Sequence, residues 1–174
     1  QAILDMTSLH EKFGYLKGLK VGIIGDIAHS RVALSNIHGL KTMGAEVTLC
    51  GPSTLIPPFA EELGVSVNYN VDEVIEWADA LNVLRIQRER MGGGLLPSVR
   101  EYRNLFGITT DRLSMHKKEI VIMHPGPMNR GVEIDSSVAD SDQAIILDQV
   151  LNGVASRMAI LYLLLGGKQE EGDS

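Results

Sequence analysis

Segments typical of β-strands and segments typical of α-helices alternate along almost the whole chain, and this alternation most strongly limits its possible folds. Strands are expected at five short runs rich in Val, Ile and Leu, at 19–24, 46–50, 65–69, 80–84 and 119–123. Helices are expected between them, at 30–43, 59–63, 71–77 and 97–106. Strands that alternate with helices form a parallel sheet with right-handed crossovers. The sequence therefore predicts an α/β fold with an open, mainly parallel five-stranded sheet and helices on both faces.

Both ends of the chain carry apolar segments that the predicted sheet does not need. The run 2–13 has the apolar spacing of a helix, and 142–165 reads as a long helix that is apolar nearly all round toward its end. Such a helix must pack on more than one neighbour. These terminal helices suggest that a partner domain is absent from this chain. The polar tail 168–174 is expected to be disordered.

Composition excludes several classes of protein. The chain has 174 residues, enough for one domain, and a formal net charge of -6, which argues against nucleic-acid binding. Cys50 is the only cysteine, so no intrachain disulfide is possible and a reducing compartment is the default. The longest uncharged apolar run, 158–165, is too short to span a membrane, and no signal peptide is recognisable. The chain begins with Gln1 rather than a methionine, which suggests processing or a longer parent.

The first candidate site follows the first strand, where Gly25-Asp26-Ile27-Ala28-His29-Ser30-Arg31 leads into a helix. A glycine at a strand end before a helix N-terminus can bind anions. The Rossmann-like arrangement also suggests a dinucleotide, but the three-glycine fingerprint is not met and no acidic residue ends the second strand. Arg31 opposes the helix dipole, which favours a ligand-facing role, although a solvent-exposed arginine explains the spacing equally well. His29 and Ser30 are expected to orient the loop.

The second candidate site follows the fourth strand, in Arg85-Ile86-Gln87-Arg88-Glu89-Arg90. If this segment stays extended, Arg85, Gln87 and Glu89 share one side. Arg85 leaves a hydrophobic strand toward the ligand edge, where a guanidinium can grip a carboxylate with two hydrogen bonds. A solvated, self-paired turn is the alternative, and it is favoured for Arg88. The glycines at 92–94 suggest a hinge of a closing loop, or a plain surface loop.

The third candidate site is the segment 123–134 (Met-His-Pro-Gly-Pro-Met-Asn-Arg-Gly-Val-Glu-Ile), which follows the fifth strand. Its prolines and glycines exclude both a helix and ladder pairing, and open α/β sheets bind ligands at this edge. His124 could be a base or a metal ligand, but a structural histidine is at least as well supported, because the other histidines lack metal-ligand spacing. Carbonyl groups fixed by Pro125 and Pro127 could accept hydrogen bonds from an amine. The expected loop-locking residues are Asn129, Arg130 and Glu133.

Taken together, the three strand ends offer two arginines, a glutamine and rigid carbonyl groups. This set suits a small dicarboxylate that carries an amine, and it includes no obvious nucleophile, metal centre or cofactor site. Cys50 is expected in the core, because it has no basic neighbours in the sequence to activate its thiol. The chemistry would depend on positioning and charge stabilisation.

The segments 25–33, 84–90 and 123–134 closely resemble motifs in the aspartate-binding half of bacterial aspartate carbamoyltransferases, and the resemblance covers essentially the whole chain. The run 1–5 (Gln-Ala-Ile-Leu-Asp) resembles the end of the family's His-Pro-Thr-Gln element. Related ornithine carbamoyltransferases have His-Cys-Leu-Pro where this chain has His124-Pro125-Gly126-Pro127, which favours aspartate. The resemblance implies a cytoplasmic enzyme of pyrimidine biosynthesis that transfers the carbamoyl group of carbamoyl phosphate to L-aspartate and releases phosphate.

The matching motifs also imply a role for each site residue. Gln1, Arg31 and Arg85 would be catalytic: the arginines would hold the two aspartate carboxylates, and Gln1 would contact the carbamoyl group. Gln87 would assist from a mobile loop. Gly126 and Pro127 would place backbone oxygens near the attacking amine and the carbamoyl nitrogen. The loop-stabilising residues would be Glu89, Arg90 and His124.

The resemblance divides the chain into an interdomain helix (1–15), an aspartate-binding domain (16–141), a C-terminal helix (142–166) and a disordered tail (167–174). The family's carbamoyl-phosphate domain is missing from this sequence. Carbamoyl phosphate would therefore be bound through a separate N-terminal domain, and the chain alone should be inactive. Family members form homotrimers in which a neighbouring subunit supplies catalytic residues. A regulatory chain or dihydroorotase is a further expected kind of partner.

Two other hypotheses compete with a half-enzyme. The chain could be an isolated, non-catalytic module that binds an amino acid or assembles with a partner, but a pure scaffold has no need for Arg31, Arg85 and Gln87. It could also be a nucleotide-binding oxidoreductase domain, against which the absent glycine fingerprint argues.

Overall fold

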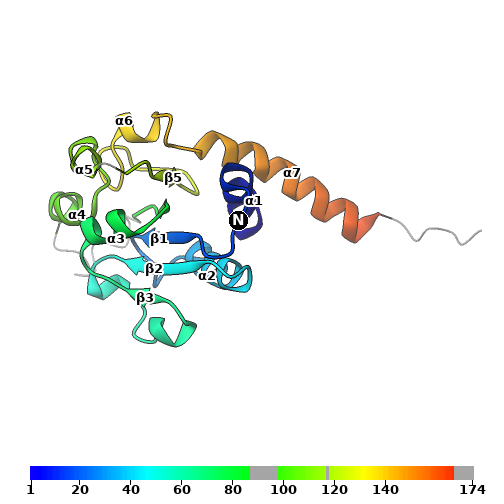
Figure 1. The fold of residues 1–174 in the computed structure, drawn as a ribbon, viewed down its shortest axis with the longest axis horizontal. Helices are drawn as coiled ribbons and strands as arrows, with labels where there is room; N and C mark the ends of the chain where they lie inside the picture. The colour runs from blue at the N-terminus through cyan, green and yellow to red at the C-terminus, as the bar shows by residue number, and fades with distance from the viewer. Residues whose placement is uncertain (87–97, 117, 167–174) are drawn as a thin grey trace, which may run out of the picture.

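A computed structural model of the chain describes residues 1–86, 98–116 and 118–166. Five strands form one sheet in the order β3-β2-β1-β4-β5, and all four neighbouring pairs are parallel (Figure 1). Their bounds are β1 (Lys20–Ile24), β2 (Glu46–Cys50), β3 (Ser66–Val67), β4 (Ala80–Val83) and β5 (Val121–Met123). The predicted five-stranded parallel sheet is therefore confirmed.

Helices cover both faces of this sheet. The helical elements are α1 (Ala2–Phe13), α2 (Arg31–Thr42), the 3₁₀ turns η1 (Ser53–Leu55) and η2 (Ala60–Leu63), α3 (Val71–Trp77), α4 (Val99–Phe106), α5 (Thr110–Met115), α6 (Ser136–Ala139) and α7 (Ile146–Leu165). One hydrophobic cluster joins α1 and α2 to the sheet, and a second joins α3, α4 and α6 to it. The prediction of an α/β sandwich of helices around one sheet is confirmed.

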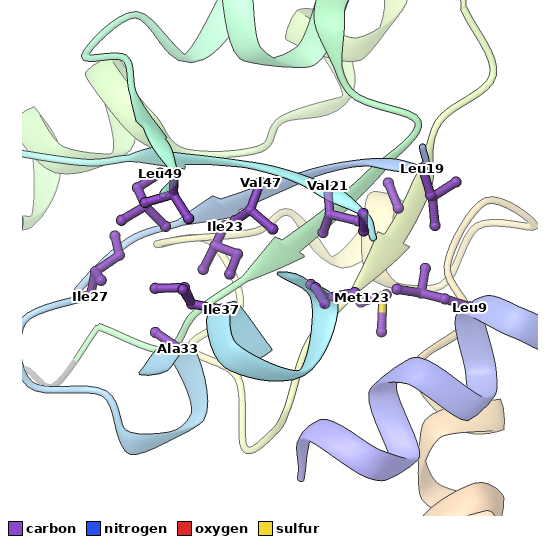
Figure 2. Close-up of a cluster of buried hydrophobic side chains, with 14 of the residues drawn as sticks. Leu9, Leu19, Val21, Ile23, Ile27, Ala33, Ile37, Val47, Leu49 and Met123 are labelled. Carbon is purple, nitrogen blue, oxygen red and sulfur yellow. The ribbon is translucent and has the colours of Figure 1, made fainter. Parts of the chain in front are cut away.

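The alternation of side chains along β1 supplies both clusters. Val21 and Ile23 point toward α2, where Ile23 lies near Ile37, as Figure 2 shows. Ile24 belongs to the opposite cluster. Gly22 also faces that side, where a Cβ would lie 2.8 Å from Val74 of α3, so only a glycine lets α3 pack this closely on the strand. Because β1 is buried on both faces and paired on both edges, its end is a rigid support for the loop that follows.

Several element boundaries differ from the sequence expectation for local reasons. The last helix begins at Ile146 rather than at 142, because the preceding residues pair with β5: Ile122 N–H donates to Gln143 O, and Ile145 N–H donates to Ile122 O. Helix α4 begins at Val99 because the Ser98 hydroxyl caps it. The helices α5 and α6 were not expected, and β3 is shorter than expected.

Helices α1 and α7 lie side by side at one end of the sheet, and the far end of α7 extends away from the rest of the molecule (Figure 1). Leu147, Leu151 and Leu164 on α7 are 82%, 69% and 78% exposed. Among the described residues, no helix is both long and apolar enough to cross a membrane. The expected disordered tail lies outside the described residues.

Candidate functional site

The three predicted site segments meet at the carboxyl edge of the sheet. The chain runs from β1 outward to β3 and then returns to β4 on the other side of β1, so the strand order reverses between β1 and β4. Open α/β sheets bind ligands at this kind of reversal. Arg31 follows β1, Arg85 follows β4, and the segment 124–134 follows β5. The topology thus brings Arg31, Arg85 and the segment 124–134 to three adjacent strand ends.

The loop between β1 and α2 is fixed by its own polar groups. Asp26 is buried, and its Oδ1 accepts the backbone N–H of His29 at 3.2 Å and contacts His29 Nδ1 at 2.8 Å. The N–H groups of Ile27 and Ala28 both donate to Leu55 O, at 3.1 and 2.9 Å. The Ser30 hydroxyl accepts the Ala33 N–H and caps α2. His29 and Ser30 therefore orient this loop, as expected.

The two arginines occupy different surroundings at this edge. Arg31 is the first residue of α2 and is exposed. Within the described residues, its guanidinium forms no hydrogen bond or ion pair. Arg85 is half-buried two residues beyond β4, and Ile86 beside it is buried. A cation at the positive end of a helix has no local electrostatic reason to be there, so its position favours an anionic ligand.

The segment 124–134 is held by two fully buried side chains, His124 and Glu133. His124 Nδ1 accepts the Gly126 N–H at 2.9 Å, and His124 Nε2 lies 3.3 Å from Glu133 Oε1. A ring nitrogen that accepts an N–H carries no proton, so the proton of this neutral imidazole is on Nε2, where it faces the carboxylate. Both nitrogens are engaged inside the loop. This arrangement favours a loop-organising role for His124 over a base or a metal ligand.

Glu133 also ties this loop to the strand that carries Arg85. Its carboxylate accepts both the backbone N–H and the side-chain amide of Asn129, and the same Asn129 amide donates to Ile86 O at 2.9 Å. Ile86 lies between Arg85 and Gln87. Arg130 is bound outside the loop by the Asp140 carboxylate, through two hydrogen bonds of 2.8 Å. Asn129, Arg130 and Glu133 thus lock the segment as the sequence indicated.

Gln1 and the 124–126 segment line one cavity of about 300 Å³. Leu4 of α1 and Gln149, Gly153 and Arg157 of α7 complete much of its wall. The peptide bond between Gly126 and Pro127 is cis, and both residues are exposed. The cavity therefore combines a carboxamide, the loop backbone and a further arginine at one end of the sheet.

A larger hollow of about 540 Å³ lies between η1, η2 and β3, but it contains none of the predicted site residues. Of its lining residues only Glu61 is charged, so it lacks the cations that a dicarboxylate needs. In the described part of the chain, no three His, Cys, Asp or Glu side chains gather as a metal site. We therefore place the candidate site at the β1, β4 and β5 strand ends.

Cys50 lies at the end of β2 but is fully buried in the core. Burial raises the pKa of its thiol to about 12, while Arg112 lowers it and Asp72 raises it further by weaker charge interactions. A thiol with so high a pKa is a poor nucleophile at neutral pH. Cys50 therefore belongs to the core, as the sequence indicated.

Three predicted residues, Gln87, Glu89 and Arg90, lie outside the described residues. Two residues that the sequence reasoning passed over, Asp5 and Gln149, are buried; Gln149 lines the cavity, and Asp5 accepts a hydrogen bond from Gln1. Their signal was present in the sequence as polar residues on the apolar face of a helix: Asp5 precedes Leu9 by one turn on α1, and Gln149 follows Ile145 by one turn.

The chain is similar in sequence to carbamoyltransferases. The family model for the aspartate/ornithine carbamoyltransferase, Asp/Orn binding domain, matches residues 17–164. The aspartate carbamoyltransferase catalytic subunit of Gemmatimonas aurantiaca is 57% identical over 174 residues, which are 100% of this chain and 54% of that protein. The chain thus spans about half the length of the curated relatives it matches.

Solved structures agree with this similarity. Aspartate transcarbamoylase from Trypanosoma cruzi, in complex with carbamoyl phosphate, superposes with a TM-score of 0.81 and 27% identity, over 92% of this chain and 54% of that one. Ornithine carbamoyltransferase from Pyrococcus furiosus superposes with a TM-score of 0.79 and 26% identity, over 97% and 56%. Since both substrate types occur among these structures, the fold alone does not choose between aspartate and ornithine.

Proposed function

The chain belongs to the aspartate/ornithine carbamoyltransferase family, and on this premise we propose that it is the aspartate-binding part of an enzyme that makes N-carbamoyl-L-aspartate. In this reaction the amine of L-aspartate attacks the carbonyl carbon of carbamoyl phosphate. A carbon–nitrogen bond forms, the bond from that carbon to the bridging phosphate oxygen breaks, and the amine gives up a proton as phosphate leaves. The reaction belongs to pyrimidine biosynthesis.

The observation that carries this proposal is the convergence of two arginines and a rigid backbone loop on adjacent strand ends. Arg31 and Arg85 follow the two strands between which the strand order reverses. We assign them to the two carboxylates of aspartate, because a guanidinium matches a carboxylate with two parallel hydrogen bonds. Ornithine has only one carboxylate, and its second amine is a cation that the two arginines would repel. The charge of the site therefore favours aspartate.

We carry the remaining assignments over from the family resemblance; of these residues, Gln1 and Gly126 line the cavity. Gln1 would contact the carbamoyl group, and the carbonyl groups of Gly126 and Pro127 would accept hydrogen bonds from the attacking amine and the carbamoyl nitrogen. Gln87 would assist, and Glu89 with Arg90 would stabilise a closed loop. No side chain in this set acts as a nucleophile. The rate enhancement would come from holding the amine and the carbonyl carbon in line and from stabilising the developing charge.

A carbamoyl-phosphate domain, on the same or another chain, is part of this proposal. The chain spans 54% of its Gemmatimonas relative, and the exposed apolar face of α7 offers a surface for such a domain. We further propose a cytoplasmic homotrimer of catalytic chains, with a regulatory chain or dihydroorotase as an additional partner. The division into 1–15, 16–141, 142–166 and 167–174 stays a prediction within the same proposal.

The test is formation of carbamoyl-aspartate from carbamoyl phosphate and L-aspartate, with ornithine as the matched alternative substrate. The chain is assayed by itself and with the N-terminal half of the Gemmatimonas relative added in trans. We expect no turnover by the chain alone and aspartate-dependent product when the second domain is present. Product with ornithine but not with aspartate would overturn the substrate assignment. Absence of product with either, although the two halves form a stable complex, would favour a non-catalytic module.

A further inference from the structure

We propose that Asp5 and Gln149 are positioning residues, which together set the Gln1 carboxamide and the 124–126 backbone on the wall of the same cavity. This inference rests on the proposed function only where it treats Gln1 and this loop as substrate contacts. The hydrogen bonds that carry it involve four separate elements, α1, α2, β4 and α7.

Asp5 is a buried carboxylate whose neighbours are amides. Its exposed fraction is only 1%. Oδ1 accepts the Gln1 Nε2 at 2.9 Å and the Gln149 Nε2 at 2.8 Å. Oδ2 accepts the Asn36 Nδ2 at 2.7 Å and faces the Asn82 Nδ2 at 3.5 Å. Only a group that accepts on both oxygens can serve all of these donors, which is what an ionised carboxylate provides.

The carboxylate decides which way the Gln149 amide points. Because Asp5 only accepts, the NH₂ end of Gln149 must face it, and the carbonyl end must face away. That oxygen, Oε1, accepts the backbone N–H of His124 at 2.9 Å. His124 begins the loop that lines the cavity. The carboxylate on α1 therefore fixes the first peptide of the loop through one side chain of α7.

The same oxygen of Asp5 orders Gln1. The Gln1 NH₂ group donates to it, so the carbonyl oxygen of Gln1 is the end that remains for a ligand in the cavity. An amide oxygen accepts hydrogen bonds, and the carbamoyl group carries N–H donors. Asp5 thus presets both the Gln1 contact and the loop contact, and neither needs to reorganise when a substrate binds.

The experiment compares two buried carboxamides of α7 that lie one turn apart. Gln149 connects α1 to the loop, whereas Asn152 donates only to Ser8 Oγ and Glu11 Oε2 of α1, at 3.0 and 2.7 Å. We make Gln149→Leu, Gln149→Glu and the control Asn152→Leu. Turnover is measured in the complete enzyme with its carbamoyl-phosphate domain, and amide hydrogen exchange of the 124–130 peptide is measured on this chain.

We expect Gln149→Leu and Gln149→Glu to lower kcat by roughly 10- to 100-fold, because a loop shifted by about 1 Å misplaces the reacting atoms. The KM for aspartate should change less than about threefold, because the arginines that hold aspartate are untouched. Exchange at 124–126 should accelerate. Asn152→Leu should destabilise the chain as much as Gln149→Leu but leave kcat and this exchange unchanged.

The double variant Asp5→Asn/Gln149→Glu separates positioning from simple loss of stability. Gln149→Glu alone sets two carboxylates against each other, whereas in the double variant the new asparagine can donate to the new glutamate, which still accepts from His124. We expect slow exchange at 124–126 to return, whereas kcat should stay low, because the donating end of the new asparagine can no longer accept the Gln1 NH₂. Equal losses of kcat in the Leu variants at 149 and 152 would overturn the inference. Exchange at 124–126 that is as fast in the double variant as in Gln149→Glu would overturn it as well.

The two proposals fail in different ways. If the parent enzyme produces no carbamoyl-aspartate or carbamoyl-ornithine with any added domain, the proposed function is wrong, yet the exchange measurement still decides whether Gln149 holds the loop. Faster exchange in Gln149→Leu than in Asn152→Leu supports the positioning role. Identical exchange in the two variants contradicts it.

Discussion

At the scale of single residues, Arg31 shows a conflict between stability and binding. It is exposed in the first turn of α2, where its charge opposes the helix dipole. We expect Arg31→Gln to stabilise the chain by about 0.3–1 kcal/mol at low ionic strength and to abolish aspartate-dependent activity of the complete enzyme. Thermal unfolding and turnover, measured on the same preparations, check both outcomes.

Lys41 provides the matched control, since it lies in the last turn of the same helix, where a cation is favourable. Lys41→Gln should lower stability slightly and leave turnover unchanged. A destabilised Arg31→Gln variant that retains full activity would show that Arg31 serves the helix and not a ligand.

Cys50 gives a prediction about pH. Burial raises the pKa of its thiol from 9.0 to about 12, so the folded chain keeps this proton at pH values where the unfolded chain loses it. This difference in pKa does not change the free energy of unfolding below pH 9. Between pH 9 and about pH 12 it lowers the free energy of unfolding by at most about 1.4 kcal/mol per pH unit. Urea unfolding from neutral pH upward measures the free energy of unfolding of the parent and of Cys50→Ala. The difference between the two proteins should change only above pH 9. A difference in unfolding free energy that does not depend on pH would mean that the Cys50 thiolate forms as easily in the folded chain as in the unfolded one.

Residue patterns predicted the site better where the relevant contacts are local. The predicted loop-orienting roles of His29 and Ser30 depend on hydrogen bonds between residues three positions apart, and such local spacing is visible in a sequence. The Asp5–Gln149 bond joins residues 144 positions apart. A polar residue in an apolar helix could be noticed, but its partner could not be chosen without the tertiary fold.

At the scale of elements, α7 is the least covered part of the described structure. Leu151 and Val154 are 69% and 53% exposed on it. We expect Leu151→Lys and Val154→Lys to leave the unfolding free energy within about 0.5 kcal/mol of the parent, to reduce self-association of the chain, and to weaken its complex with an added carbamoyl-phosphate domain. Analytical ultracentrifugation with and without that domain measures both effects.

Leu105→Lys is the matched control, because Leu105 is a leucine of α4 that is 54% exposed away from α7. It should change neither self-association nor complex formation. Equal self-association and equal complex formation by the Leu105 and Leu151 variants would show that no partner binds the α7 face.

Element boundaries were predicted where a cap or a glycine marks them and missed where pairing across the fold decides them. The bounds of α1, β2 and α3 agree with the sequence prediction. The delayed start of α7 results from hydrogen bonds to β5, which no local signal reports. Helix α5 was missed because its sequence, Thr-Asp-Arg-Leu-Ser-Met, has no apolar period, and its Thr109 cap gave the only cue.

At the scale of the whole molecule, stability should be concentrated in the centre of the sheet. Strands β1 and β4 are paired on both sides and lie between the two hydrophobic clusters. We expect amide hydrogen exchange to be slowest at Ile23 and Leu81, faster in the edge strand β3, and fastest in the second half of α7. Exchange resolved by NMR on the isolated chain checks this order. Protection of α7 equal to that of β1 in dilute solution would contradict it.

The overall architecture could be predicted because alternating strand and helix signals leave few possible topologies. The location of the site followed from the same rule, since parallel strands end at one edge. What the sequence could not supply is the set of hydrogen bonds around Glu133 and Asp5. These bonds join the 124–134 segment to Ile86 and, through Gln149, to α1.

The hydrogen bond between Asp5 of α1 and Gln149 of α7 also determines when the loop can be anchored while the chain is being synthesised. A ribosome releases the N-terminal part of a chain first, so all five strands emerge before Gln149 does. The sheet can assemble early, whereas the peptide at His124 acquires its side-chain acceptor only after the last helix has been made. A nascent chain released before that point would contain every strand and every candidate substrate contact, yet would hold its loop without the anchor on α7.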